Sequence, residues 1–227
     1  MSKPYVCEYC NTGYSREKTL AVHMCEKKRR HLAKDTKQNQ LAFRCFQLFY
    51  KIGTNSKKQK TYTDFVDSQY FNGFVKFASY CIDLKVDDVD AYVRWLLQKG
   101  TPLTKWSSDI TFNEWIKIRL KTESPDRAVE RTILFLEEWA GESKMPWYTY
   151  FSSVNPNLAV FHICSGKISP WVLYTSNTAS AIFDKLNSEQ TKMITDYVDP
   201  EYWFRKLHKN KEDVDWVLEI LGKVDLA

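Results

Sequence analysis

Glycine and proline are scarce in this chain, with seven of each among 227 residues. An all-β sandwich needs many tight turns built from these residues, so the composition disfavours that class. No apolar run approaches the roughly 20 residues needed to cross a bilayer. The first residues also lack the apolar stretch of a secretory signal. We therefore expect a soluble, cytoplasmic protein without a membrane partner.

The sequence also lacks the usual signatures of catalysis. It contains no Gly-rich loop able to cradle a phosphate, and we assemble no carboxylate cluster of the kind that a nuclease needs. His162 and Cys164 alternate in an apolar segment, but no third group orients them as base and nucleophile. Helix capping accounts for Asp87, Asp88 and Asp90. We expect a protein that is not an enzyme.

Six cysteines are present, and their distribution argues against a disulfide framework. Cys7, Cys10 and Cys25 lie close to the N-terminus, whereas the other three are scattered among apolar neighbours. This distribution is typical of a metal site together with ordinary buried thiols in a reducing compartment.

A metal-ligand pattern opens the chain. Two residues separate Cys7 from Cys10, and twelve separate Cys10 from His23. A Cys-x2-Cys knuckle presents two thiolates to one tetrahedral ion, and a following helix brings a histidine to its other side. About thirty residues bury too little surface to fold alone, so the ion would supply much of the folding free energy.

This segment resembles the C2H2 zinc finger over residues 3–31. Besides the three ligands, Tyr5, Tyr14 and Leu20 match the family's core positions, including the aromatic four after the second cysteine and the leucine three before the histidine. The resemblance implies a ββα finger, a bound Zn²⁺ ion and a nucleic-acid partner, with double-stranded DNA favoured over RNA.

The fourth ligand departs from the family pattern, because neither Glu26 nor Lys27 is the second histidine usual there. The main candidates are Cys25 and His31. On an unbroken helix Cys25 points roughly 200° away from His23, and His31 lies about 12 Å further along the axis. Each therefore needs the helix to end, loosen or bend after His23. We favour Cys25, since a small distortion suffices and thiolate binds zinc strongly; His31, water and Glu26 stay open.

Positive charge is concentrated in the same part of the chain. Residues 1–60 carry 14 Lys/Arg and 4 Asp/Glu, whereas the whole chain has a net charge of +5. A basic segment attached to a mildly acidic body indicates a polyanion-binding end. The family resemblance places the base-contacting positions at Arg16, Lys18, Thr19 and Val22.

A dense run of basic residues follows His23. We expect it to continue the finger helix and to contact phosphates, which gives salt-sensitive affinity that does not depend on sequence. The run comprises Lys27, Lys28, Arg29, Arg30, Lys34 and Lys37. A solvated helix face, or neutralisation of a three-thiolate site, is the alternative. Because single fingers also dock proteins, the rival function is a protein–protein adaptor.

The rest of the chain predicts an all-α body. Residues 41–52 repeat apolar positions at three- and four-residue steps, the pattern of an amphipathic helix. We expect a zinc finger with its basic helical extension over 1–53 and an all-α domain over 61–227, with the boundary in the polar segment between them. The helical body is expected to engage a protein partner.

Three local patterns in this body bear on its helices. Thr111 and Glu114 form a capping box that opens one predicted helix. Ser124 and Pro125 place an N-cap before a proline at the first position of the next. The apolar segment Leu158–Cys164 fits either a buried helix or a strand, because periodicity does not separate the two.

The whole chain also resembles zinc-finger proteins of tailed bacteriophages that have no settled function, most strongly over His23 to Tyr50. The likeness implies a bacterial host cytoplasm and a role in phage DNA transactions, such as transcription, replication or packaging, or in host takeover.

Overall fold

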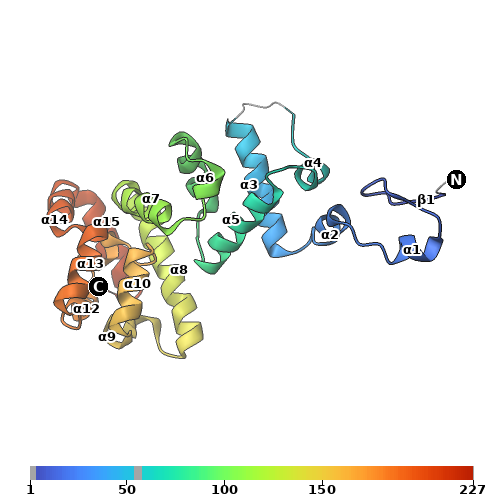
Figure 1. Ribbon diagram of the computed structural model, residues 1–227. Helices are drawn as coiled ribbons and strands as arrows, with labels where there is room; N and C mark the ends of the chain where they lie inside the picture. The colour runs from blue at the N-terminus through green and yellow to red at the C-terminus, as the bar shows by residue number, and fades with distance from the viewer. Residues whose placement is uncertain (1–3, 54–57, 227) are drawn as a thin grey trace. The chain divides into compact units, whose positions relative to one another are not determined.

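The computed structural model describes residues 4–53 and 58–226 of the chain. Apart from two short strands near the N-terminus, the elements of the described part are helices (Figure 1). None of these helices is both long enough and apolar enough to span a membrane. The chain divides into two compact units, one ending at Ser108 and the other beginning at Asp109. The fold confirms the predicted all-α body with a small ββα start.

The first unit opens with an antiparallel hairpin and a short helix, which together form the ββα segment. Its elements are β1 (Tyr5–Val6), β2 (Gly13–Tyr14), α1 (Glu17–Ala21), α2 (Glu26–Leu32), α3 (Lys37–Gly53), α4 (Tyr62–Val66), α5 (Phe71–Asp83), α6 (Val89–Gln98) and the 3-10 helix η1 (Leu103–Lys105). In the hairpin, Tyr5 pairs with Tyr14 and Val6 with Gly13.

An aromatic core holds the helices of the first unit together. Helix α3 packs along α5 and α6. The ring of Phe46 in α3 lies 5.2 Å from that of Phe65 and 5.6 Å from that of Phe74, measured between centroids. Trp106 is fully buried against Phe74 in an edge-to-face arrangement, which aromatic rings prefer. This core places α3 at the centre of the unit.

The division of the chain differs from the one we expected. We placed a boundary in the polar segment after residue 53, of which residues 54–57 lie outside the described residues. The amphipathic pattern correctly predicted α3 and its buried face, which includes Ala42, Cys45 and Phe46. That pattern does not indicate which helices α3 packs against, and both α5 and α6 come after the polar segment. Because α3 packs on them, the first unit extends to Ser108.

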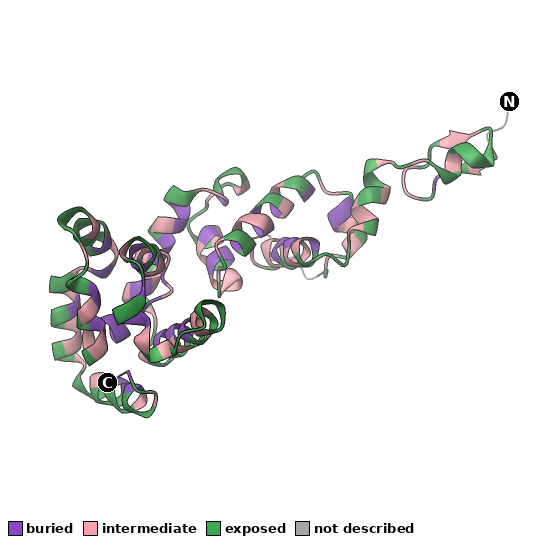
Figure 2. Cartoon of the chain, turned by 90° about the horizontal axis from the view of Figure 1, so that it is seen from below, coloured by how far each residue is buried: buried purple, intermediate pink, exposed green. Residues whose placement is uncertain are grey.

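The described part of the second unit is entirely helical. Its elements are α7 (Asp109–Thr122), α8 (Pro125–Ser143), η2 (Trp147–Thr149), α9 (Tyr150–Ser153), α10 (Pro156–Cys164), α11 (Pro170–Thr175), η3 (Asn177–Ala179), α12 (Ser180–Phe183), α13 (Ser188–Val198), α14 (Pro200–Lys209) and α15 (Lys211–Lys223). Buried residues line the inner sides of the helices, and exposed residues cover the outer sides (Figure 2). Trp171 and Trp203, with ring centroids 5.5 Å apart, lie in this core.

Of the two helix starts that we predicted in the second unit, one is confirmed and the other is wrong. Helix α8 begins at Pro125 after the N-cap Ser124, as predicted. The predicted capping box is wrong, because α7 begins at Asp109 and Thr111 is buried inside its first turns. Because the helix begins two residues before Thr111, this residue lies within the helix and not at its N-cap.

The ambiguous segment Leu158–Cys164 is helical and forms most of α10. Pro156 occupies the first turn, and the side chain of Asn155 accepts a hydrogen bond from the backbone N–H of Asn157. These two residues are the local signal that favours a helix over a strand here.

Candidate metal centre

Cys7 and Cys10 are held by the turn that joins β1 to β2. The backbone N–H of Cys7 donates to the carbonyl of Thr12 at 3.0 Å, and that of Asn11 donates to the carbonyl of Cys7 at 2.8 Å. Asn11 has a φ of 57°, a left-handed conformation that asparagine adopts more readily than most residues. The turn is therefore closed by its own backbone, with both cysteines inside it.

The chain leaves helix α1 before His23 and enters a new helix after Cys25. Helix α1 ends at Ala21, and Cys25 has an extended backbone as the N-cap residue of α2. The backbone N–H of Lys28 donates to Sγ of Cys25 at 3.4 Å. The helix therefore ends before His23 and not after it as expected, and both His23 and Cys25 lie in the segment between α1 and α2. The expectation that the basic run continues the finger helix is wrong, because this run forms a new helix, α2.

These turns bring together the four side chains that we expected to bind metal: Cys7, Cys10, His23 and Cys25. Their ligand atoms all lie within 4.8 Å of one another. Sγ of Cys7 is 4.0 Å from Sγ of Cys25, and Sγ of Cys10 is 3.3 Å from Nε2 of His23. Within residues 4–53 and 58–226, no other group of three or more Cys, His, Asp or Glu side chains gathers in this way.

The separations fit a tetrahedral metal ion. With metal–sulfur bonds of about 2.3 Å, two thiolates of a tetrahedron lie roughly 3.8 Å apart, and a thiolate and an imidazole nitrogen roughly 3.6 Å apart. The observed distances of 4.0 and 3.3 Å lie on either side of these values. Four protein ligands leave no open position for a substrate, which is typical of a structural site. The cluster can therefore hold a metal ion.

Tyr14 orients the histidine of this cluster. Its hydroxyl oxygen lies 2.7 Å from Nδ1 of His23, while Nε2 of the same ring faces Cys10. A metal ion at Nε2 requires the tautomer that carries its hydrogen on Nδ1, and the Tyr14 oxygen is placed to accept that hydrogen. The spacing predicted Tyr14 only as an apolar core residue and gave no signal for this hydrogen bond.

Neighbouring groups shift the thiol pKa values in opposite directions. Thr12, whose Oγ1 lies 3.2 Å from Sγ of Cys10, stabilises the thiolate and lowers the pKa of Cys10 to about 6. Removal from water raises the pKa of Cys25, and the hydrogen bond from the Lys28 backbone opposes this effect. Cys10 is thus readily available as the thiolate that metal binding requires.

His31 lies in α2, outside the cluster. Its ring centroid is 5.2 Å from that of Tyr9 in the knuckle and 5.9 Å from that of Tyr62 in α4. The hydroxyl of Tyr62 donates to the carbonyl of Arg30 at 2.8 Å. His31 therefore packs between two tyrosines, where it links the knuckle to α4.

The residues predicted to contact nucleic acid fall into two groups: one is exposed to solvent, and the other makes contacts within the protein. Those on or beside α1 are exposed, as is one residue of α2, and their side chains face solvent. This group comprises Arg16, Lys18, Thr19 and Arg29. Val22, predicted as a fourth base-contacting position, is 80% exposed.

Arg30 has a different environment from its neighbour Arg29. Its side chain is only 17% exposed and pairs with Glu26. Its guanidinium donates to the carbonyl of Val66 at 2.7 Å and lies 4.3 Å from the ring centroid of Phe71. These contacts connect α2 to α4 and α5, so the Arg30 side chain packs within the unit and does not face solvent as its neighbour does.

The lysines of the basic run also make intramolecular contacts. Nζ of Lys27 lies 2.6 Å from Oδ1 of Asp67, and Nζ of Lys28 donates to the carbonyl of His23 at 3.3 Å. Nζ of Lys34 lies 5.7 Å from the ring centroid of Tyr62. Lys27 and Lys34 are nevertheless exposed and retain capacity for an external anion.

The residues weighed for catalysis have structural partners. Nδ1 of His162 lies 2.8 Å from the hydroxyl of the buried Tyr150, and its ring packs against Phe135. Sγ of Cys164 contacts the carbonyl of Met193. The Asp88 side chain caps α6, as predicted.

No protein-family model, curated protein or solved structure matches this chain. The class that the fold and the site define is a helical protein whose N-terminal ββα segment carries a Cys3His cluster able to hold a metal ion.

Proposed function

We propose that this protein binds nucleic acid, DNA in preference to RNA, without catalysing a reaction, and that a Zn²⁺ ion stabilises its binding module. The observation that carries the proposal is the four-ligand cluster formed by Cys7, Cys10, His23 and Cys25. The cluster holds α1, whose basic side chains are exposed.

The dependence on metal follows from the burial of the ββα segment. Among residues 4–25, Cys7 alone is buried, while Tyr14 and Leu20 are only half-buried. A segment with so small a core lacks the hydrophobic free energy to fix its own fold. Metal–ligand bonds supply it, as in other small zinc modules.

The exposed cations support nucleic acid as the partner. Arg16 and Lys18 extend from the finger and Arg29 from α2, where they are free to meet phosphates or base edges. A single finger reads about three base pairs, too few for genomic specificity. The finger therefore anchors the protein, and the helical body engages a protein partner in transcription, replication or packaging, in keeping with the phage resemblance.

The test begins with metal content. The purified full chain is expected to carry one zinc ion, which Cys25→Ser releases to a chelator and His31→Ala retains. Retention of zinc by Cys25→Ser together with its loss from His31→Ala would contradict the ligand set.

Binding to a labelled DNA duplex is then titrated with salt from about 50 to 200 mM. The double variant Arg16→Ala/Lys18→Ala is expected to lower affinity, while the exposed pair Lys144→Ala/Lys192→Ala leaves it unchanged. An RNA duplex of the same length measures the preference for DNA. Absence of binding at the lowest salt overturns the proposal.

One observation favours a protein–protein adaptor as the second candidate. Val22 is 80% and Met24 48% exposed, which places two apolar side chains on the surface of the finger region. Apolar residues of this kind serve protein contacts better than phosphate contacts. Zinc content without DNA binding would favour this function.

A further inference from the structure

Helix α3 has an unusual charge composition. Its 17 residues include Lys37, Arg44 and Lys51 and contain no Asp or Glu. Exposed helices usually intersperse both signs, often as pairs four residues apart. From residue 27 to residue 60 the chain holds 11 Lys/Arg and one acidic residue, Asp35. A positive surface potential follows from this composition.

The three cations of α3 share one face of the helix. They are spaced by seven residues, so each is rotated by only about 20° from the last. The buried residues Ala42 and Phe46 lie on the opposite side, and Phe46 packs there against Phe74 of α5. Seven residues rise by about 10.5 Å, so the cations form a stripe about 21 Å long. We call Lys37, Arg44 and Lys51 the α3 stripe.

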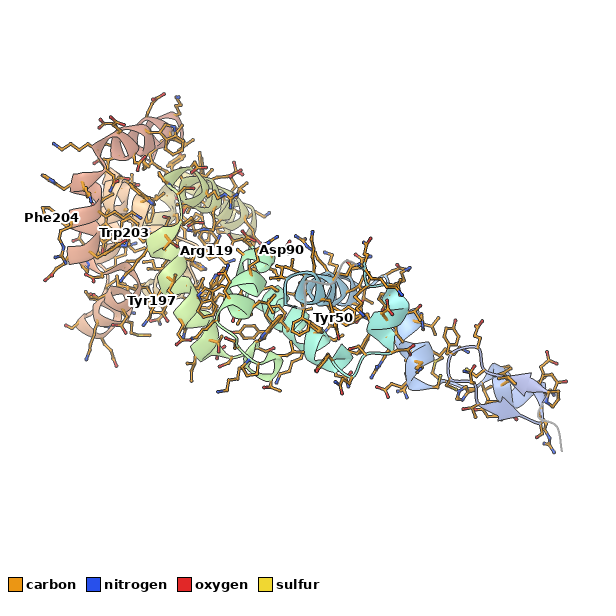
Figure 3. All side chains as sticks on the ribbon, turned by 90° about the horizontal axis from the view of Figure 1, so that it is seen from above. Tyr50, Asp90, Arg119, Tyr197, Trp203 and Phe204 are labelled. Carbon is orange, nitrogen blue, oxygen red and sulfur yellow. The ribbon has the colours of Figure 1, made fainter. Side chains whose placement is uncertain are left out.

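The α3 stripe is accessible to solvent. Lys37 and Lys51 are exposed, and the Arg44 side chain is 65% exposed although its Nη2 lies 2.8 Å from Oδ2 of Asp90. Asp90 is labelled on α6 in Figure 3. A guanidinium has five N–H donors, so one carboxylate partner leaves the others free for a second acceptor. Gln40, exposed on the same face, adds an amide donor.

We infer that the α3 stripe is a second nucleic-acid contact, which binds the phosphate backbone without reading bases. The inference rests on the proposed function and extends it beyond the finger. At about 3.4 Å per base pair, the stripe spans about six base pairs, more than the three that the finger reads. It supplies affinity that the finger lacks, because each phosphate contact releases counterions.

The experiment uses the full zinc-loaded chain and a DNA duplex of about 30 base pairs in a salt titration. The triple variant Lys37→Gln/Arg44→Gln/Lys51→Gln is expected to reduce the slope of log affinity against log salt by about 2 to 3. Lys37→Gln/Lys51→Gln keeps the Arg44–Asp90 pair intact and is expected to reduce the slope by about 2. Glutamine is a good helix former, so both variants should keep the wild-type circular dichroism spectrum.

A matched control removes the same charge elsewhere. The variant Lys76→Gln/Lys105→Gln/Lys192→Gln changes three other exposed lysines and is expected to leave the slope within about 0.5 of wild type. An unchanged slope in both stripe variants overturns the inference, as does an equal fall in the control. If the stripe variants lose binding to anionic vesicles while their DNA binding is unchanged, the inference is also overturned, and the stripe is then assigned to membranes. If the wild type binds no duplex, the proposed function fails instead.

Discussion

At the scale of single residues, the candidate metal cluster includes a hydrogen bond as well as its four potential ligands. Nδ1 of His23 is 2.7 Å from the Tyr14 hydroxyl, and Tyr14 lies in β2 opposite Tyr5. Groups that hold the second nitrogen of a metal-binding histidine fix its tautomer and its orientation. Tyr14 is therefore placed to orient His23 toward a metal ion held by the cluster.

Tyr14→Phe is expected to weaken zinc affinity about tenfold to a hundredfold, because the ring is kept and only the hydroxyl is removed. Competition with a chromophoric chelator measures the change. Tyr5→Phe, at the paired position of the hairpin, is the matched control and should retain wild-type affinity. An equal loss in the two variants would show that Tyr14 does not orient His23.

Adjacent residues of α2 show how burial separates identical side chains. Arg30 faces α4 and α5 and is largely buried, whereas Arg29 faces solvent. One residue along a helix is a rotation of about 100°, which is enough to exchange interior for solvent. The two arginines should therefore differ in what their removal costs.

Arg30→Ala is expected to lower the free energy of unfolding by about 2 kcal/mol, because charge-assisted hydrogen bonds contribute about 1.5–3 kcal/mol. Urea denaturation measures this value. Arg29→Ala should change stability by less than about 0.5 kcal/mol but reduce the salt slope of DNA binding by about 0.9. The reverse pattern would contradict the assignment of Arg30 to the interior.

At the scale of elements, the second unit contains a buried ion pair. Its partners are Glu123, which directly follows α7, and Arg131, which lies in α8. Nη2 of Arg131 lies 2.5 Å from Oε2 of Glu123, and the two side chains are 7% and 6% exposed. Arg131 also donates to the carbonyls of Gly166 and Lys167, after α10. One arginine thus connects three segments of the unit.

Glu123→Gln is expected to destabilise the second unit by about 3 kcal/mol, because it leaves a buried guanidinium without its counter-charge. Thermal and urea unfolding of the full chain measure the loss. Glu201→Gln is the control, since Glu201 is 88% exposed and 3.7 Å from Arg205. Its expected effect is below about 0.5 kcal/mol. Similar effects of the two changes would argue against a structural role for the buried pair.

At the scale of the whole molecule, metal dependence should be confined to the start of the chain. The aromatic core around Phe46, Phe74 and Trp106 contains no ligand of the cluster. Cys25, however, is both a member of the candidate cluster and the N-cap of α2, so we expect loss of metal to destabilise the first turn of that helix as well.

Chelation of zinc at neutral pH is expected to raise amide hydrogen exchange over residues 4–28 by more than tenfold, because we propose that metal–ligand bonds hold the fold there. Exchange in α3, α5 and the second unit should stay within about twofold. Mass spectrometry of peptic fragments measures both. Global unfolding by the chelator would show that the helical body depends on metal, and unchanged exchange over 4–28 would show that the finger does not.

The sequence by itself predicted the elements whose causes are local. The ligand spacing lies within 25 residues, and the paired cysteines and His23 gather where it indicated. The start of α8 follows from Ser124 and Pro125 alone. The apolar period of residues 41–52 similarly predicted α3. Each of these signals acts over a few turns of chain, so no distant partner was needed.

Only the tertiary structure decided what depends on distant partners. The basic run predicted six similar cations, but contacts with Val66 and Phe71 make Arg30 an interior residue. The packing of α3 on helices beyond the polar segment moved the unit boundary to Ser108. Hydrophobic period and charge describe one face of one element, whereas burial depends on the surface that meets that face.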